Sequence, residues 1–92
     1  MQQQPEIGQI VHYVLPDGHY PGEHRPAFVV KVWGATSVNL QVFVDGSDDY
    51  ADYNGTLWAT SVSLDPTGTQ LRSWHWPEFV PLQISEPTAP TQ

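Results

Sequence analysis

Short segments in which apolar and polar residues alternate constrain the fold of this chain most strongly. The clearest covers residues 38–44, where every second residue is valine or leucine. Because successive side chains of a strand point to opposite faces, this period of two predicts a β-strand. Similar patterns predict four more strands, so that the expected set covers residues 7–15, 27–33, 38–44, 57–64 and 71–76. No segment reads as a convincing helix, and the chain is therefore predicted to be all-β.

Turn residues separate the expected strands and suggest how these are connected. Pro16-Asp17-Gly18 ends the first strand, and residues 19–26 hold two prolines and a glycine, which predict an ordered loop. Another long loop joins the third and fourth strands. Five short strands curl most naturally into a small, partly open barrel of the SH3-like or OB-like kind, and the two long loops favour the SH3-like form.

The chain is short enough for one domain only. Residues 1–6 form a polar lead-in, residues 7–84 the predicted barrel, and residues 85–92 a flexible polar tail. Because a domain of this size has a thin core, association between copies is a common supplement to its stability. We therefore expect a homo-oligomer.

The charge balance excludes several classes of partner. Lys31, Arg25 and Arg72 are the three basic residues against ten acidic ones, which gives a formal net charge of −7. General nucleic-acid binding relies on neutralising several phosphates, and three cations on an acidic chain argue against it. An anionic membrane surface is disfavoured for the same reason. A small anionic ligand remains compatible, since arginines of two neighbouring subunits could converge on one phosphate.

The densest chemical segment is residues 71–77, Leu-Arg-Ser-Trp-His-Trp-Pro. Read as a strand, it places Arg72, Trp74 and Trp76 on one face and His75 on the other. Aromatic rings beside an arginine suit stacking on a planar ligand with the guanidinium on an anionic group, and they suit a protein interface equally well. The predicted ligand-binding residues are Arg25, Trp33, Arg72, Trp74 and Trp76. Trp58 shares its face with valine and leucine and is assigned to the core.

Metal binding and catalysis find less support. The histidines His12, His19, His24 and His75 lack the spacing of a known zinc pattern, so we expect structural or surface roles for them. The acidic loop of residues 45–56 lacks the register of an EF-hand and is expected to be solvated. No serine sits in a Gly-x-Ser-x-Gly elbow. The prediction is a protein with no catalytic activity, no metal and no cofactor, although His19 and His24, or the acidic loop, leave a metal role open.

Several segments together resemble a widespread family of small phage and prophage proteins. They are residues 7–13, 24–27, 38–43, 45–46 and 58–62, and above all the Trp-His-Trp-Pro-Glu element of residues 74–78. The resemblance implies a phage-type origin and an all-β fold, and it assigns no functional residue.

Taken together, the residues and the resemblance predict a non-enzymatic phage-type binding protein in the host cytoplasm. It would sequester a small, nucleotide-like ligand as a counter-defence, with Trp74 or Trp76 stacking on the ring and Arg25 or Arg72 holding the phosphate. The alternative is a virion structural protein, such as a capsid or tail decoration protein, which uses the same surface to contact another protein. The sequence leaves both alternatives open. No signal peptide and no apolar run of membrane-spanning length is present, which favours an intracellular protein over a membrane protein.

Overall fold

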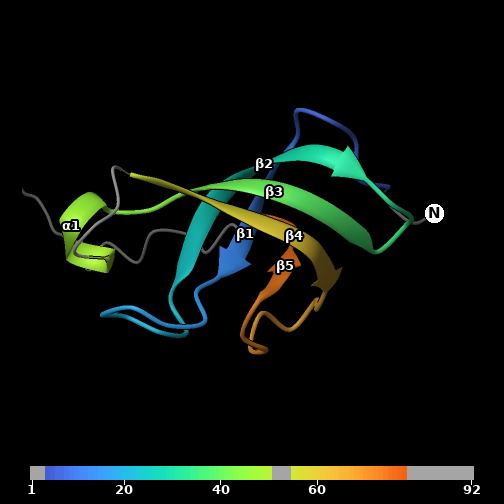
Figure 1. Cartoon of the computed structure of the whole chain (residues 1–92). Helices are drawn as coiled ribbons and strands as arrows, with labels where there is room; N and C mark the ends of the chain where they lie inside the picture. The colour runs from blue at the N-terminus through green and yellow to red at the C-terminus, as the bar shows by residue number, and fades with distance from the viewer. Residues whose placement is uncertain (1–3, 51–54, 79–92) are drawn as a thin grey trace, which may run out of the picture.

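A computed structural model describes residues 4–50 and 55–78 of the chain (Figure 1). Within these residues the elements are β1 (Ile10–Val14), β2 (His24–Val32), β3 (Ser37–Phe43), α1 (Gly46–Asp49), β4 (Thr56–Leu64) and β5 (Ser73–His75). The all-β prediction is confirmed, and the only helix in the described part of the chain, α1, has four residues. Residues 79–84 of the predicted domain and the predicted tail of residues 85–92 lie outside the described residues.

The five strands form a closed barrel in the order β1-β2-β3-β4-β5. Neighbours pair antiparallel from β1 to β4, β5 pairs parallel with β4, and β5 returns antiparallel to β1. The barrel is therefore closed rather than partly open as predicted. A sequential order of this kind differs from the Greek-key order of the OB-fold, and so it agrees with the SH3-like preference.

Two strand boundaries differ from the prediction. β2 begins at His24 and pairs Pro26 with His12, although residues 19–26 were predicted to be a loop. β5 is only three residues long, and Arg72 precedes it with a φ of 65°. This left-handed backbone breaks the alternation that the sequence suggested. The prediction that Arg72 and Trp74 share one strand face is therefore wrong.

Trp74 is the largest fully buried side chain among the described residues, and it fills the barrel interior. It belongs to one core cluster with apolar residues of β1 to β4, among them Val11, Val29, Leu40 and Val62. Its indole N–H donates a 3.0 Å hydrogen bond to the backbone carbonyl of Thr36, so the polar atom of this core residue is satisfied. With an exposed fraction of 0%, Trp74 has no surface to offer a ligand.

Trp58 lies on the outside because β4 contains a β-bulge. Val38 of β3 faces Val62, whereas Leu40 faces Ala59, so β4 carries one residue more than β3 over this stretch. Ser61 takes up the extra residue with a φ of 53°. Ala59 and Val62 consequently both face the core, and Trp58 is 54% exposed. The assignment of Trp58 to the core, which assumed strict alternation, is wrong.

The side chain of Asn39 holds the bulge in place. Its Oδ1 atom accepts a 2.7 Å hydrogen bond from the backbone N–H of Ser61 and a 2.9 Å bond from the indole N–H of Trp33. Asn39 is only 7% exposed, and its side chain supplies an acceptor for the backbone N–H of Ser61 within the bulge. One asparagine thus fixes both the bulge and the position of Trp33.

We predict that Asn39→Leu lowers the free energy of unfolding by about 1–3 kcal/mol, because it removes the shared acceptor of two N–H groups. Urea denaturation of the variant and the wild type measures this difference. Ser63→Ala, an exposed change on the same strand as the bulge, is the matched control and should be nearly neutral. An Asn39→Leu variant as stable as the Ser63→Ala variant would contradict this role of Asn39.

Among the residues that the structure describes, no helix is long and apolar enough to cross a membrane.

Candidate functional site

A groove with a volume of about 610 Å³ runs along β4 beside the bulge. Residues 57–62 of β4 line one side of the groove. The remaining lining residues come from β1 and the turn that follows it, together with Tyr50 after α1 and Arg72 before β5. We call this the β4 groove. Its volume lies within the range of small-molecule sites, about 300–1,000 Å³.

Trp58 and Arg72 both line the β4 groove, and both side chains are accessible to solvent. The backbone N–H of Arg72 donates a 3.0 Å bond to the carbonyl of Val14, which anchors the turn that carries the guanidinium. Within the described residues this guanidinium makes neither an ion pair nor a hydrogen bond. The groove thus brings together an exposed indole and a guanidinium.

Tyr13 and Asp17 complete the polar character of the β4 groove. Burial raises the pKa of the Tyr13 phenol, the positive charge of Arg72 partly offsets this effect, and the negative charge of Asp17 adds to it. Asp17 accepts a 2.7 Å hydrogen bond from the hydroxyl of Tyr50. The groove therefore holds one cation and one carboxylate, which limits how much negative charge a ligand can bring.

Arg25 does not face the β4 groove but pairs with Asp49 of α1. Its Nε atom lies 2.7 Å from Asp49 Oδ2 and its Nη2 atom 2.7 Å from Asp49 Oδ1, in a bidentate arrangement. The Asp49 side chain is 0% exposed. The hydrogen bonds from Arg25 are the main cause that holds the pKa of the Asp49 carboxyl below its ordinary value, and the Asp45 N–H contributes further. Arg25 is thus committed to a structural pair.

This pair also corrects the expected picture of the acidic loop. The loop was predicted to be solvated, but Asp49 is buried and α1 forms within it, whereas Asp52 lies outside the described residues. The turn after β1 docks on α1, since the His19 N–H donates a 2.9 Å bond to the Asp49 carbonyl. Gly18 allows this approach because a Cβ there would lie 2.6 Å from the Asp49 carbonyl oxygen. Tyr50, the next residue after Asp49, is held beside this turn and lines the β4 groove.

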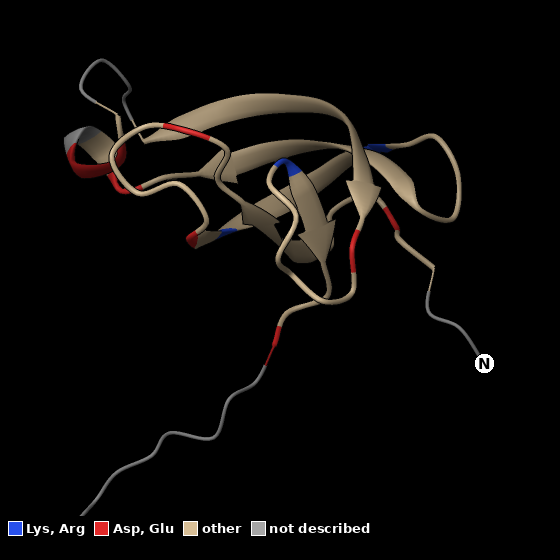
Figure 2. Cartoon of the chain, turned by 90° about the horizontal axis from the view of Figure 1, so that it is seen from below, with Lys and Arg blue, Asp and Glu red and all other residues tan. Residues whose placement is uncertain are grey.

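The two remaining predicted site residues lie elsewhere. Trp33 is 58% exposed, and Lys31 Nζ lies 4.2 Å from the centroid of its ring, so one face of the indole is already covered. Trp76 is half-buried and packs edge-on against Trp74 with their centroids 5.1 Å apart. Of the five predicted residues, the structure therefore places only Arg72 at the β4 groove, and the three basic residues stand apart on the barrel (Figure 2).

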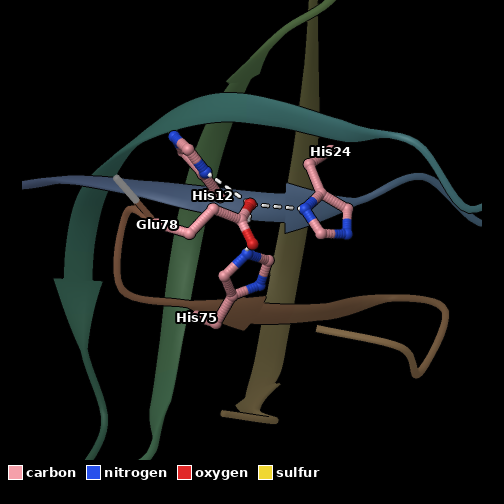
Figure 3. Close-up of side chains that lie close together, drawn as sticks. All are labelled: His12, His24, His75 and Glu78. Carbon is pink, nitrogen blue, oxygen red and sulfur yellow. Dashed lines mark hydrogen bonds and ion pairs between the residues drawn. The ribbon is translucent and has the colours of Figure 1, made fainter. Parts of the chain in front are cut away.

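A second site lies where β1, β2 and β5 meet. His12 of β1, His24 of β2 and His75 of β5 all point at the carboxylate of Glu78 (Figure 3). We call these four residues the histidine–glutamate cluster. The Oε1 atom of Glu78 lies 3.2 Å from His12 Nδ1, 2.6 Å from His24 Nδ1 and 3.1 Å from His75 Nε2.

These contacts lower the pKa of Glu78 to about 2, with the hydrogen bond to His24 as the largest cause, followed by that to His75. The cluster was not predicted from the sequence, since the four residues show no metal-binding spacing. The sequence held a partial signal for the cluster, because Glu78 lies only three positions after His75. His19 stays outside, with its Nδ1 atom 2.7 Å from the carbonyl of Asp48.

Comparison of the chain with protein-family models, curated proteins and solved structures finds no match. The fold and its sites therefore describe this protein as a small closed β-barrel with an open groove on β4 and a histidine–glutamate cluster near β5.

We predict that Arg25→Met lowers the free energy of unfolding by about 3–5 kcal/mol, because it leaves the Asp49 carboxylate buried without a countercharge. Chemical denaturation of the single variant and of the double variant Arg25→Met with Asp49→Leu provides the test. The double variant should recover most of the loss, since it removes both charges. A single variant that loses less than about 1 kcal/mol would show that the pair behaves like an exposed ion pair.

The pair of Arg25 and Asp49 also predicts that the free energy of unfolding depends on pH. Because the pKa of Asp49 is lowered in the folded protein, the carboxylate stabilises the fold above its unfolded pKa, and this contribution is lost as the pH falls through the folded value. The stability difference between wild type and Asp49→Asn should therefore be largest near neutral pH and shrink below pH 3.8, the ordinary pKa of this carboxyl. A difference that stays constant from neutral pH down to about pH 3 would count against this assignment.

Proposed function

We propose that this protein is a non-enzymatic binding module whose β4 groove holds a small, planar, anionic ligand. Trp58 stacks on the ring of the ligand, and Arg72 pairs with its anionic group. One observation carries the proposal: the half-exposed indole of Trp58 and the guanidinium of Arg72, which has no partner among the described residues, line the same groove. An aromatic ring and an arginine are the side chains suited to this double recognition.

The shape and charge of the groove narrow the ligand. Thr60 and Ser61 add hydroxyl groups beside Trp58, and these can hydrogen-bond the polar edge of a heterocycle. Asp17 in the same groove disfavours a ligand with many negative charges. With a formal net charge of −7, the protein as a whole also repels polyanions. A nucleotide with few phosphates combines the required ring and the required anionic group.

The finer form of the proposal is a phage-encoded protein that sequesters a nucleotide-like host signal in the host cytoplasm. The resemblance of residues 74–78 to phage proteins supports this setting. Sequestration requires only tight binding, and the indole and the guanidinium of the β4 groove are recognition groups that can supply it.

A second candidate is a virion structural protein, and the outer face of the sheet favours it. Ile10, Phe28, Gln41 and Trp58 are successive register partners across β1 to β4, and three of these four are exposed apolar residues. Phe43 extends the row, with its ring centroid 5.3 Å from that of Phe28. An apolar row of this kind is typical of surfaces that contact another protein. It also supports the expectation of a homo-oligomer.

Natively purified protein distinguishes the two candidates. Its mass should be measured once as the intact complex, for stoichiometry, and once denatured, to release a carried small molecule. A co-purified nucleotide supports sequestration. A ligand-free monomer without affinity for nucleotides contradicts it, and high-copy incorporation into purified virions supports the structural role instead.

We predict that Trp58→Ala weakens binding of a nucleoside monophosphate or a cyclic dinucleotide by about 1–3 kcal/mol, the usual contribution of base stacking. Arg72→Asn removes the charge and keeps a residue that tolerates positive φ, and we expect a loss of at least similar size. Titration calorimetry measures both. Neither variant should shift the melting temperature strongly, because both side chains are exposed.

Trp33→Ala is the matched control, because Trp33 is as exposed as Trp58 and lies outside the β4 groove. Its binding should equal that of the wild type. The proposal is overturned if nucleotides bind equally well to wild type, Trp58→Ala and Arg72→Asn, or if the Trp33→Ala change causes the same loss as Trp58→Ala.

A further inference from the structure

We propose that the histidine–glutamate cluster is a binding site for one divalent first-row transition metal ion, with Zn²⁺ as the best fit. The ligands are one nitrogen each of His12, His24 and His75 and one carboxylate oxygen of Glu78. This site is separate from the β4 groove, and the inference does not depend on the proposed ligand there.

The spacing of the four side chains matches a tetrahedral ligand set. Their candidate ligand atoms all lie within 4.8 Å of one another. Zinc–nitrogen and zinc–oxygen bonds of about 2.0–2.1 Å in tetrahedral geometry separate neighbouring ligand atoms by about 3.3 Å. The distances from Glu78 Oε1 to His12 Nδ1 and His75 Nε2 are 3.2 and 3.1 Å. Small side-chain movements therefore suffice to admit an ion.

The hydrogen bonds of His24 orient one nitrogen of its ring toward the cluster. Its Nε2 atom lies 2.9 Å from the carbonyl oxygen of Gly68, and a carbonyl oxygen can only accept, so Nε2 carries a proton. Nδ1 therefore faces Glu78 and lies 2.6 Å from the carboxylate oxygen. In the imidazolium Nδ1–H donates to this carboxylate, and in the neutral ring the Nδ1 lone pair is the metal ligand, so the ion takes the place of that proton. A ring N–H that donates to a backbone carbonyl is also the usual outer contact of a metal-bound histidine.

His75 supplies a second, independent observation. It is 3% exposed, and its Nδ1 atom is buried without a hydrogen-bond partner in the described part of the chain. The polar contact that the structure gives this imidazole is the one from Nε2 into the cluster. Its Nε2 atom is therefore the nitrogen that faces the other three ligands and is available to the ion, while Nδ1 points away from the cluster contact.

Gly68 shapes the site from outside. A Cβ at this position would lie 3.1 Å from His75 Cε1 and 3.2 Å from His24 Cε1, and the residue has a φ of 70°. A glycine here therefore lets the turn approach both imidazole rings while its carbonyl orients His24. Gly68 is in this sense a positioning residue.

The donor set selects the kind of metal. Three imidazole nitrogens and one carboxylate oxygen suit Zn²⁺ and its neighbours in the first transition row. Calcium and magnesium prefer sites built of oxygen ligands only. The side chains of His12, His24 and Glu78 are 26%, 30% and 42% exposed, so an ion can reach the site from solvent.

The test is a titration of chelator-treated full-length protein with Zn²⁺, followed by calorimetry. We expect one ion per chain. We also expect Co²⁺ to give the intense visible absorption of tetrahedral coordination, and zinc to raise the melting temperature. His12→Gln and Glu78→Gln change partly exposed side chains and should fold. Each should weaken zinc binding by more than the roughly 10- to 100-fold loss that removal of an outer contact causes.

His19→Gln is the matched control, because His19 is an exposed histidine outside the cluster. It should bind zinc as the wild type does, and Trp58→Ala should do the same. The proposal is overturned if the wild type binds no stoichiometric zinc, if His12→Gln and Glu78→Gln bind it unchanged, or if His19→Gln weakens binding as much as they do.

Discussion

The buried pair of Arg25 and Asp49 is the interaction on which the β4 groove depends. A carboxylate with 0% exposure is tolerated only beside a countercharge, and Arg25 meets it with two parallel hydrogen bonds. The pair ties α1 to the start of β2, and α1 in turn holds the turn after β1 and Tyr50. Because this pair occupies Arg25 and Lys31 lies against the ring of Trp33, Arg72 is the basic residue that lines the β4 groove.

Alternation of apolar residues predicted the fold well because it reports a local property. A strand that buries one face needs an apolar residue at every second position, and each of the five predicted segments overlaps one strand. The boundaries were less predictable, since pairing with a distant strand decides them. β2 extends back to His24 because β1 lies beside it to accept the pairing, in spite of Pro26.

The site was less accessible to sequence reasoning, and the two tryptophans show why. Trp58 and Trp74 exchange their expected places, with Trp58 outside and Trp74 in the core. The causes are positive φ angles at Ser61 and Arg72, residue types that give no warning of such a backbone. Asn39, which holds the bulge at Ser61, lies 22 positions away in the sequence. Local periodicity carries no information about such a contact.

The histidine–glutamate cluster escaped prediction for a related reason. His12 and Glu78 are 66 positions apart, and only closure of the barrel makes His12 and His75 direct neighbours on adjacent strands. Residue spacing reveals a metal site when its ligands share one turn or hairpin. Here each histidine comes from a different strand, so the topology had to be known first.

Closure of the barrel rests on its shortest strand. β5 pairs through two residue positions with β1 and through two with β4, whereas the other pairings are longer. Yet this strand carries Trp74 into the core and follows directly after Arg72 at the β4 groove. The histidine–glutamate cluster joins β1, β2, the last residue of β5 and the chain beyond it, so it reinforces the part of the barrel with the fewest backbone contacts. The histidine–glutamate cluster and the β4 groove thus both border β5, although they share no residue.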